Sequence, residues 1–263
     1  MKHVLITGAA GGMGAAAAEQ LRRAGYFVFA LDRTACRAEE NLLPITADIT
    51  DPAGLQAAFD RVAAVTDRLY AVVHFAGMYA LDSLVELPQE KLERIFHVNV
   101  LGAMAVNRTF LPLLGEGSRI LITTSELAPL DPLPFTGLYA VTKSALDKYA
   151  FSLRMELQLL GIRVSVLRPG AVATDMLGVS TSQLDAFCEN TRLYRCNAKR
   201  FKAIVDRVEA GNIPPVKVAQ KVLTILSARR PRYVYSINRN PLLLLMHLLP
   251  KRVQTWIIGK ILR

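Results

Sequence analysis

Short apolar runs alternate with helix-length segments along most of the chain, and this alternation limits the fold more than any other feature. The runs are rich in Val, Ile and Leu throughout, which is typical of parallel strands covered on both faces. Strands separated by helices form right-handed β-α-β units of one doubly wound sheet. We therefore expect strands at residues 3–7, 26–31, 43–46, 69–75, 119–124, 162–167 and 233–237.

Helical segments are expected between these strands, among them residues 14–24, 91–114, 144–160 and 216–228. The link between residues 33 and 43 is too short for a full helix, so that crossover should be abbreviated. No linker rich in Pro, Gly or Ser divides the first 240 residues. This predicts one Rossmann-type α/β domain over residues 1–240, with about seven parallel strands flanked by helices.

Two segments depart from this alternation of strands and helices. Residues 175–212 form a long insertion after a strand end, where lids and substrate pockets are usually placed. The apolar and aromatic residues that it carries include Met176, Leu177, Leu184, Phe187, Leu193, Tyr194 and Phe201. The second segment is a basic amphipathic tail, residues 241–263.

The cysteine pattern argues against disulfides and against zinc. Cys36, Cys188 and Cys196 are odd in number and show no Cys-x-x-Cys spacing, so we expect no metal and a reducing compartment. The first expected strand begins almost at the initiator Met, which leaves no room for a signal peptide. The sequence thus predicts a cytoplasmic protein.

A glycine-rich turn, Thr7-Gly8-Ala9-Ala10-Gly11-Gly12-Met13-Gly14, joins the first expected strand to the first expected helix. Glycine at positions 8, 12 and 14 permits a tight turn and a close approach of the backbone to a pyrophosphate. The helix that follows points unpaired N–H groups and the positive end of its dipole at the phosphates. A turn in this context predicts a dinucleotide-binding site.

Asp32 ends the second expected strand, eighteen residues after Gly14. A carboxylate there can accept hydrogen bonds from the adenosine ribose hydroxyls and would repel a 2′-phosphate. Arg33 follows at once and could instead pair with that phosphate, whereas Gly11 offers no second basic partner. The sequence favours NAD and leaves NADP as the alternative.

Tyr139 and Lys143 stand four residues apart, so they lie one above the other on a helix. A lysine cation favours the phenolate and would lower the pKa of Tyr139 from its ordinary value of about 10. Such a pair can exchange a proton with an alcohol or carbonyl oxygen while hydride moves to or from a nicotinamide.

Three further features accompany this pair. Ser125 ends the strand at 119–124, where its hydroxyl could hold the substrate oxygen beside Tyr139. Asn99 is a polar amide among apolar residues, which is an expensive burial unless it finds partners. The segment from Pro169 to Thr174 leaves the next strand in a rigid turn, and Thr174 could meet the carboxamide end of the cofactor.

In this order and at about these spacings, the motifs resemble those of the short-chain dehydrogenase/reductase family over residues 1 to about 237. The resemblance implies strand order 3-2-1-4-5-6-7, with Tyr139 as the acid/base and Lys143 lowering its pKa and binding the nicotinamide ribose. It also implies that Ser125 positions the substrate and that Asn99 supports a water-linked proton relay. The implied cofactor contacts, besides Tyr139 and Lys143, are Thr7, Gly8, Gly12, Met13, Gly14, Asp32, Arg33, Asp48, Ile49, Ala76, Gly77, Pro169, Gly170, Val172 and Thr174.

The sequence departs from the family pattern in two places within the site. The family usually has Asn-Asn-Ala-Gly after the fourth strand, whereas this chain has His74-Phe75-Ala76-Gly77. A lone His at a strand end is expected to be a hydrogen-bonded structural residue rather than a base. Ser125 precedes Tyr139 by fourteen residues, one more than is commonest, and Glu126 stands at the commoner spacing. Its position at the end of the strand favours Ser125 over Glu126 as the residue that holds the substrate.

The tail carries a strong charge imbalance. The chain has a net charge of +10, and residues 229–263 hold eight Lys or Arg and no Asp or Glu. The leucine run at 242–249 is too short to span a bilayer. Val253, Trp256, Ile257 and Ile261 share a helical face, as in helices that lie in a membrane interface. The alternatives are a helix that closes the pocket or forms a subunit contact; nucleic acid is disfavoured, because Leu and Ile interleave with the charges.

These features predict an NAD- or NADP-dependent oxidoreductase that interconverts a secondary or primary alcohol and its carbonyl on a hydrophobic substrate. The tail and the insertion resemble those of family members acting on steroids, retinoids and other lipids. The resemblance also implies a homodimer or homotetramer, and the tail allows peripheral contact with the cytoplasmic face of a membrane. One alternative is a 3-oxoacyl-thioester reductase, and another is a dinucleotide-sensing or scaffold protein without turnover.

Overall fold

Seven parallel strands form a single sheet in the order β3-β2-β1-β4-β5-β6-β7. The computed structural model describes the backbone of residues 1–263, and the side chains of residues 1–174, 182–207 and 210–263. The strands are β1 (Lys2–Thr7), β2 (Tyr26–Asp32), β3 (Leu42–Thr46), β4 (Ala71–His74), β5 (Arg119–Thr123), β6 (Arg163–Pro169) and β7 (Val234–Ile237). The predicted fold class and strand order are confirmed.

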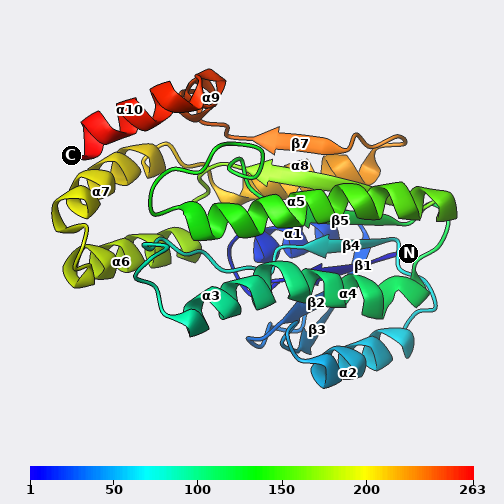
Figure 1. Cartoon of the computed structure of the whole chain (residues 1–263). Coiled ribbons are helices and arrows are strands. Elements are labelled where there is room, and N and C mark those ends of the chain that lie inside the picture. Colours follow the sequence, from blue (N-terminus) through cyan, green and yellow to red (C-terminus); the bar gives the residue numbers. More distant parts are fainter.

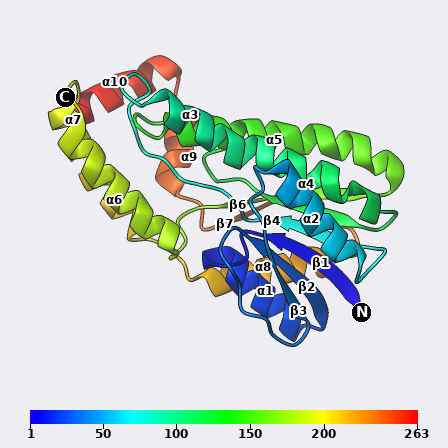
Figure 2. The same ribbon diagram turned by 90° about the horizontal axis from the view of Figure 1, so that it is seen from below.

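Helices cover both faces of this sheet (Figures 1 and 2). On one face lie α1 (Gly12–Arg23) and α8 (Pro215–Ser227); on the other lie α2 (Pro52–Ala63), α4 (Ala103–Phe110) and α5 (Gly137–Leu157). Successive strand residues supply the two cores, since Val4 and Ile6 pack toward α1 while Leu5 packs toward α2. This two-sided burial explains why the strands are apolar throughout.

Two expected helices have different boundaries in the structure. The segment expected as one helix over 91–114 consists of α3 (Gln89–Phe96), a π-helical turn (His97–Gly102), α4 and a 3-10 turn (Leu111–Leu113). Helix α5 begins at Gly137, seven residues before the expected start, because Leu138 and Ala140 are buried and extend its apolar face. The crossover between β2 and β3 contains no helix among its described residues, as expected.

The remaining helices gather beyond the carboxyl ends of the strands, at the left of Figure 1. The insertion folds as α6 (Asp175–Asn190) and α7 (Arg195–Glu209), and the tail as α9 (Pro241–Leu248) and α10 (Lys251–Leu262). Phe135 anchors the insertion, since its ring centroid lies 4.8 Å from that of Phe187 and 5.4 Å from that of Phe201. The side chains of Met176 and Leu177 lie outside the described residues.

The tail packs against this insertion. Leu262 is buried in the same cluster as Phe201, and the Asn197 side-chain amide donates to the Leu262 carbonyl at 2.7 Å. Leu242, Leu245 and Leu248 of α9 and Trp256 of α10 remain largely exposed. Within the described part of the chain, every helix is too short or too polar to cross a membrane.

Candidate active site

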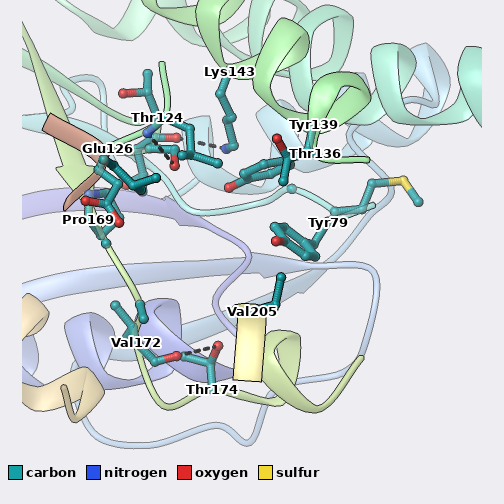
Figure 3. Close-up of a pocket in the computed structure, with 18 of the residues that line it drawn as sticks. Tyr79, Thr124, Glu126, Thr136, Tyr139, Lys143, Pro169, Val172, Thr174 and Val205 are labelled. Atoms are coloured by element: carbon teal, nitrogen blue, oxygen red, sulfur yellow. Dashed lines mark hydrogen bonds between the residues drawn. The ribbon is translucent and has the colours of Figure 1, made fainter. Parts of the chain in front are cut away.

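A pocket opens at the carboxyl ends of β4, β5 and β6, and loops, α1, α5, α7 and α9 complete its walls (Figure 3). Parallel strands bring distant parts of the sequence together at this edge, which is where ligands bind in doubly wound sheets. Ser125, Tyr139 and Lys143 all line the pocket. Its other lining residues are mostly apolar, among them Phe75, Met78, Leu127, Leu133, Phe201, Ile204, Val205 and Leu243.

Tyr139 and Lys143 occupy the first two turns of α5, where their spacing places both side chains on the pocket side. Both are buried, with exposed fractions of 8% and 6%. The Lys143 ammonium lies 5.6 Å from the centre of the Tyr139 ring and donates to the Thr123 carbonyl at 3.2 Å. The pair therefore lies in a desolvated site at the end of β5.

Burial shifts the pKa values of both groups away from their charged forms. It raises the pKa of Tyr139 well above its ordinary value, while a hydrogen bond with Ser125 acts in the opposite direction. It lowers the pKa of Lys143 to about 8. The sequence predicts that Lys143 lowers the pKa of Tyr139; in this structure the net shift is upward, because desolvation of the phenolate is the largest effect. Tyr139 is thus held as a neutral phenol, which is a proton donor.

Ser125 lies two residues beyond the end of β5, where the chain turns toward the pocket. Its hydroxyl oxygen accepts a hydrogen bond from the Leu127 amide at 3.2 Å, and the residue is buried. This turn and the loop that follows it accommodate the thirteen residues between Ser125 and Tyr139. Ser125 also lowers the pKa of Tyr139 through its side chain, whereas Glu126 makes no such contribution.

Asn99 sits in the π-helical turn and finds partners for its buried amide. Its carbonyl oxygen accepts from the Met78 amide at 2.7 Å, and its NH₂ group donates to the Met78 carbonyl at 2.9 Å and to the Thr142 hydroxyl at 3.1 Å. These bonds tie the loop after β4 to α5, beside Tyr139. Asn99 therefore holds two walls of the site in register.

The glycine-rich turn lies under the same edge of the sheet. Gly8 and Gly12 have positive φ angles of 72° and 52°, and a Cβ on Gly14 would lie 1.9 Å from the Gly8 carbonyl oxygen. The Thr7 hydroxyl accepts from the Ala76 amide at 3.3 Å, which fixes the turn against the loop after β4. Glycine at these positions keeps side chains of the turn away from the amino end of α1, where the backbone N–H groups could bind a pyrophosphate.

The adenosine end of the expected cofactor site lies at β2 and β3. The Asp32 carboxylate accepts from the Ala10 amide at 3.0 Å and from the Thr34 amide at 2.9 Å, so its orientation is fixed, while Arg33 is exposed. Asp48 accepts from the Thr50 amide and hydroxyl, and these bonds lower the pKa of its carboxyl group. Its neighbour Ile49 is buried against the π-helical turn.

The nicotinamide end is expected where β6 finishes. Pro169, Gly170, Val172 and Thr174 all line the pocket, together with Met13 and Gly77. Thr174 reaches across to the glycine-rich turn, since a Cβ on Gly12 would lie 2.9 Å from its methyl group. The structure therefore brings the candidates from residues 7–14, 76–77 and 169–174 together around one site.

His74 lies beneath the site and not in the pocket. Its Nε2 is 2.8 Å from the side-chain oxygen of Asn107, whose NH₂ group donates to the Tyr149 hydroxyl at 3.1 Å. Burial lowers the pKa of His74 to about 4, so the ring is neutral near pH 7. This agrees with the expectation of a hydrogen-bonded structural histidine.

Sequence reasoning missed Tyr79 and Thr142. The Tyr79 ring packs edge-on against Tyr139, with centroids 4.6 Å apart, and it lines the pocket. Its position two residues after Gly77 was a usable signal, since that loop was already placed at the site. Thr142 carried none, because its role depends on a hydrogen bond to Asn99, forty-three residues away.

Comparison with known proteins places these features in a family context. The profile described as short chain dehydrogenase matches residues 2–185. The uncharacterized oxidoreductase YbbO of Escherichia coli (strain K12) is 30% identical over 270 residues, covering 98% of this chain and 94% of YbbO. Mus musculus estradiol 17-beta-dehydrogenase 2 is 34% identical over 189 residues, covering 67% of this chain and 50% of that protein.

Solved structures share the fold. A short chain dehydrogenase family protein from Francisella tularensis subsp. tularensis SCHU S4 superimposes with a TM-score of 0.75 at 22% identity, covering 90% of this chain and 97% of that chain. At this identity the likeness concerns the backbone architecture alone.

Proposed function

Because the chain belongs to the short chain dehydrogenase family, whose members are oxidoreductases acting on CH–OH groups with NAD or NADP, we propose that Tyr139 is its acid/base in interconverting an alcohol and its carbonyl. The convergence of Ser125, Tyr139 and Lys143 on one pocket is the observation that supports this most directly. The alcohol is secondary or primary, and the rest of the substrate is hydrophobic.

Bound NAD or NADP supplies or takes up the hydride. In the direction of reduction, the Tyr139 hydroxyl gives its proton to the carbonyl oxygen, and the Ser125 hydroxyl donates a hydrogen bond to that oxygen. The high pKa of the buried Tyr139 keeps its proton bound until the carbonyl oxygen gains negative charge. The Lys143 cation, one helical turn away, then stabilises the tyrosinate that remains.

We propose NAD as the preferred cofactor. The tight turn that Gly8, Gly12 and Gly14 permit suits a close approach of the backbone to a pyrophosphate, and the Asp32 carboxylate is held in place to accept from ribose hydroxyls. A 2′-phosphate would meet this negative charge at close range. Arg33 is exposed nearby and keeps NADP as the alternative.

A bulky apolar substrate fits the lining of the pocket. Apolar side chains, among them leucine, methionine and phenylalanine, supply most of the wall, and Leu243 of the tail is one of them. Burial of apolar substrate surface against such walls contributes about 25 cal/mol per Å². The name of the mouse relative, estradiol 17-beta-dehydrogenase 2, points to the same class of substrate.

We also propose that α9 and α10 rest on an anionic membrane surface, with Leu242, Leu245, Leu248 and Trp256 in the interface. These four side chains are 59–79% exposed, and the eight basic residues of 229–263 match the charge of acidic lipid headgroups. Leu243, on the same short helix, faces the pocket, so a lipid-borne substrate would have a short path inward. From the resemblance to the family, we also propose that the chain assembles as a homodimer or homotetramer.

One experiment tests the proposed chemistry. Wild type and Tyr139→Phe are compared on a panel of long-chain alcohols and ketones, sterols and 3-oxoacyl thioesters, with NAD and NADP in parallel. We expect turnover of an apolar alcohol or ketone with a preference for NAD, and a loss of at least about a hundredfold in kcat in the variant.

The alternatives give different results. Preference for the thioester with NADPH would indicate a 3-oxoacyl-thioester reductase. Tight cofactor binding by calorimetry without turnover of any compound would indicate a dinucleotide sensor. Equal rates for wild type and Tyr139→Phe would remove Tyr139 as the acid/base.

A further inference from the structure

The mostly apolar pocket contains one carboxylate that the proposed chemistry does not use. Among the described residues that line the pocket, Glu126 is the sole acidic side chain and Lys143 the sole basic one. Lys143 is accounted for by its position beside Tyr139. Glu126 directly follows Ser125, so the two side chains reach the same pocket from adjacent positions of one turn.

Glu126 is held at several points, so its carboxylate has a defined position. Its backbone amide donates to the Pro169 carbonyl at 2.9 Å, which attaches it to the end of β6 (Figure 3). One carboxylate oxygen, Oε2, accepts from the Asn240 amide at 2.6 Å. The other, Oε1, lies over Gly170, where a Cβ would come within 2.9 Å of it. The side chain therefore fills the space between Ser125, the turn after β6 and the start of α9.

The charge of this carboxylate is only partly compensated within the protein. Burial raises the pKa of Glu126, while the Asn240 amide and the charge of Arg239 act in the opposite direction. No ion pair to Glu126 is formed among the described side chains. A half-buried carboxylate without a direct ion-pair partner is costly, and a ligand that supplies a cation would offset that cost.

We propose that Glu126 is a substrate-specificity residue that binds an ammonium group one or two carbons from the reacting carbinol carbon. The inference rests on the proposed function and names its substrate class: a long-chain amino alcohol and the corresponding amino ketone. The ammonium is placed this near because Ser125 and Glu126 are neighbours in the chain, with Cα atoms about 3.8 Å apart, and both line the pocket in which Ser125 is proposed to hold the reacting oxygen. An ammonium offers three donors and a full charge, whereas a substrate carboxylate at this point would be repelled.

Three alcohols with the same chain test this assignment: 1-amino-2-dodecanol, 2-dodecanol and 2-hydroxydodecanoate. They place a cation, a methyl group or an anion next to the same carbinol carbon. In wild type we expect kcat/KM to fall in that order. Glu126→Gln keeps an acceptor for the Asn240 amide but removes the charge. The kcat/KM for the amino alcohol, divided by that for 2-dodecanol, should therefore fall about tenfold or more.

Controls separate specificity from structural damage. Glu90→Gln changes an exposed carboxylate on α3 and should leave the ratio as in wild type. If Glu126 served only to tether α9, Glu126→Gln would lower kcat/KM for all three alcohols by the same factor and leave the ratio unchanged, which would overturn the inference. A wild-type preference for 2-hydroxydodecanoate would overturn it as well.

A binding measurement decides the matter independently of turnover. Decylamine and decanol are titrated into wild type and Glu126→Gln in the presence of the cofactor, with binding followed by calorimetry. We expect decylamine to bind about tenfold more weakly to the variant and decanol to bind the two proteins alike. Equal decylamine affinities would refute the role of Glu126, whereas absence of turnover with every alcohol would refute the proposed function and leave the binding result standing.

Discussion

Replacing His74 by Gln should make the protein less sensitive to acid. His74 is buried at the end of β4, and its pKa falls from an ordinary 6.5 to about 4 in the fold. Because the unfolded chain binds this proton more readily than the folded chain, stability is present above pH 6.5 and is lost as the pH falls toward 4. The difference between the unfolded and folded pKa values of His74 corresponds to about 3 kcal/mol of unfolding free energy. About 2 kcal/mol of this is lost between pH 7 and pH 4.5.

Urea unfolding at a series of pH values measures this difference. Wild type should lose about 2 kcal/mol more unfolding free energy than His74→Gln over that interval, since all other carboxyl and histidine groups contribute equally to both proteins. The variant itself is expected to be less stable at pH 7, because Gln fits the bond to Asn107 less well. His97→Gln is the control, because it makes the same substitution at an exposed position outside the buried bond between His74 and Asn107. Parallel curves for wild type and His74→Gln would refute the burial argument.

Three other predictions follow from the site and the tail. Gly170→Ala should lower stability by about 1–3 kcal/mol in thermal unfolding, because its Cβ would lie 1.9 Å from the Asn238 carbonyl oxygen; Gly115→Ala, with open space around it, should cost far less. Carbonyl reduction should slow as the pH rises through about 8, because Lys143 then loses the charge that stabilises the Tyr139 anion, and a flat profile would contradict this role. The double variant Leu245→Asp, Trp256→Asp should no longer pellet with phosphatidylglycerol vesicles, whereas Leu159→Asp, on an exposed leucine outside the tail, should pellet as wild type does. Pelleting by wild type and both variants, or by none of them, would refute the membrane proposal.

The fold could be read from the sequence because its signals are local. Apolar runs such as β1 and β6 are buried on both faces, and the connecting segments have helical length, so their order along the chain implied the sheet. The boundaries that were misplaced depend on tertiary contacts. The π-helical turn around Asn99 is a change in hydrogen-bond register that residue type does not announce.

The site also has features that the sequence predicts and features that only the fold determines. The spacing of Tyr139 and Lys143 is a local property and was readable, but the pKa of Tyr139 depends on burial, which only the fold determines. Glu126 entered the sequence reasoning merely as a rival to Ser125 for one spacing. Its significance comes from Asn240, which is 114 residues away and meets it only once β7 is in place.

The division of the pocket between early and late parts of the chain has an evolutionary consequence. The family profile ends at residue 185, after every residue proposed for proton transfer, whereas the pocket walls at Phe201, Val205 and Leu243 come later. Mutations in the last third of the gene can therefore alter which molecules are accepted while the reactive groups stay fixed. Exchange of residues 186–263 between relatives would change the substrate range while the residues proposed for proton transfer stay the same.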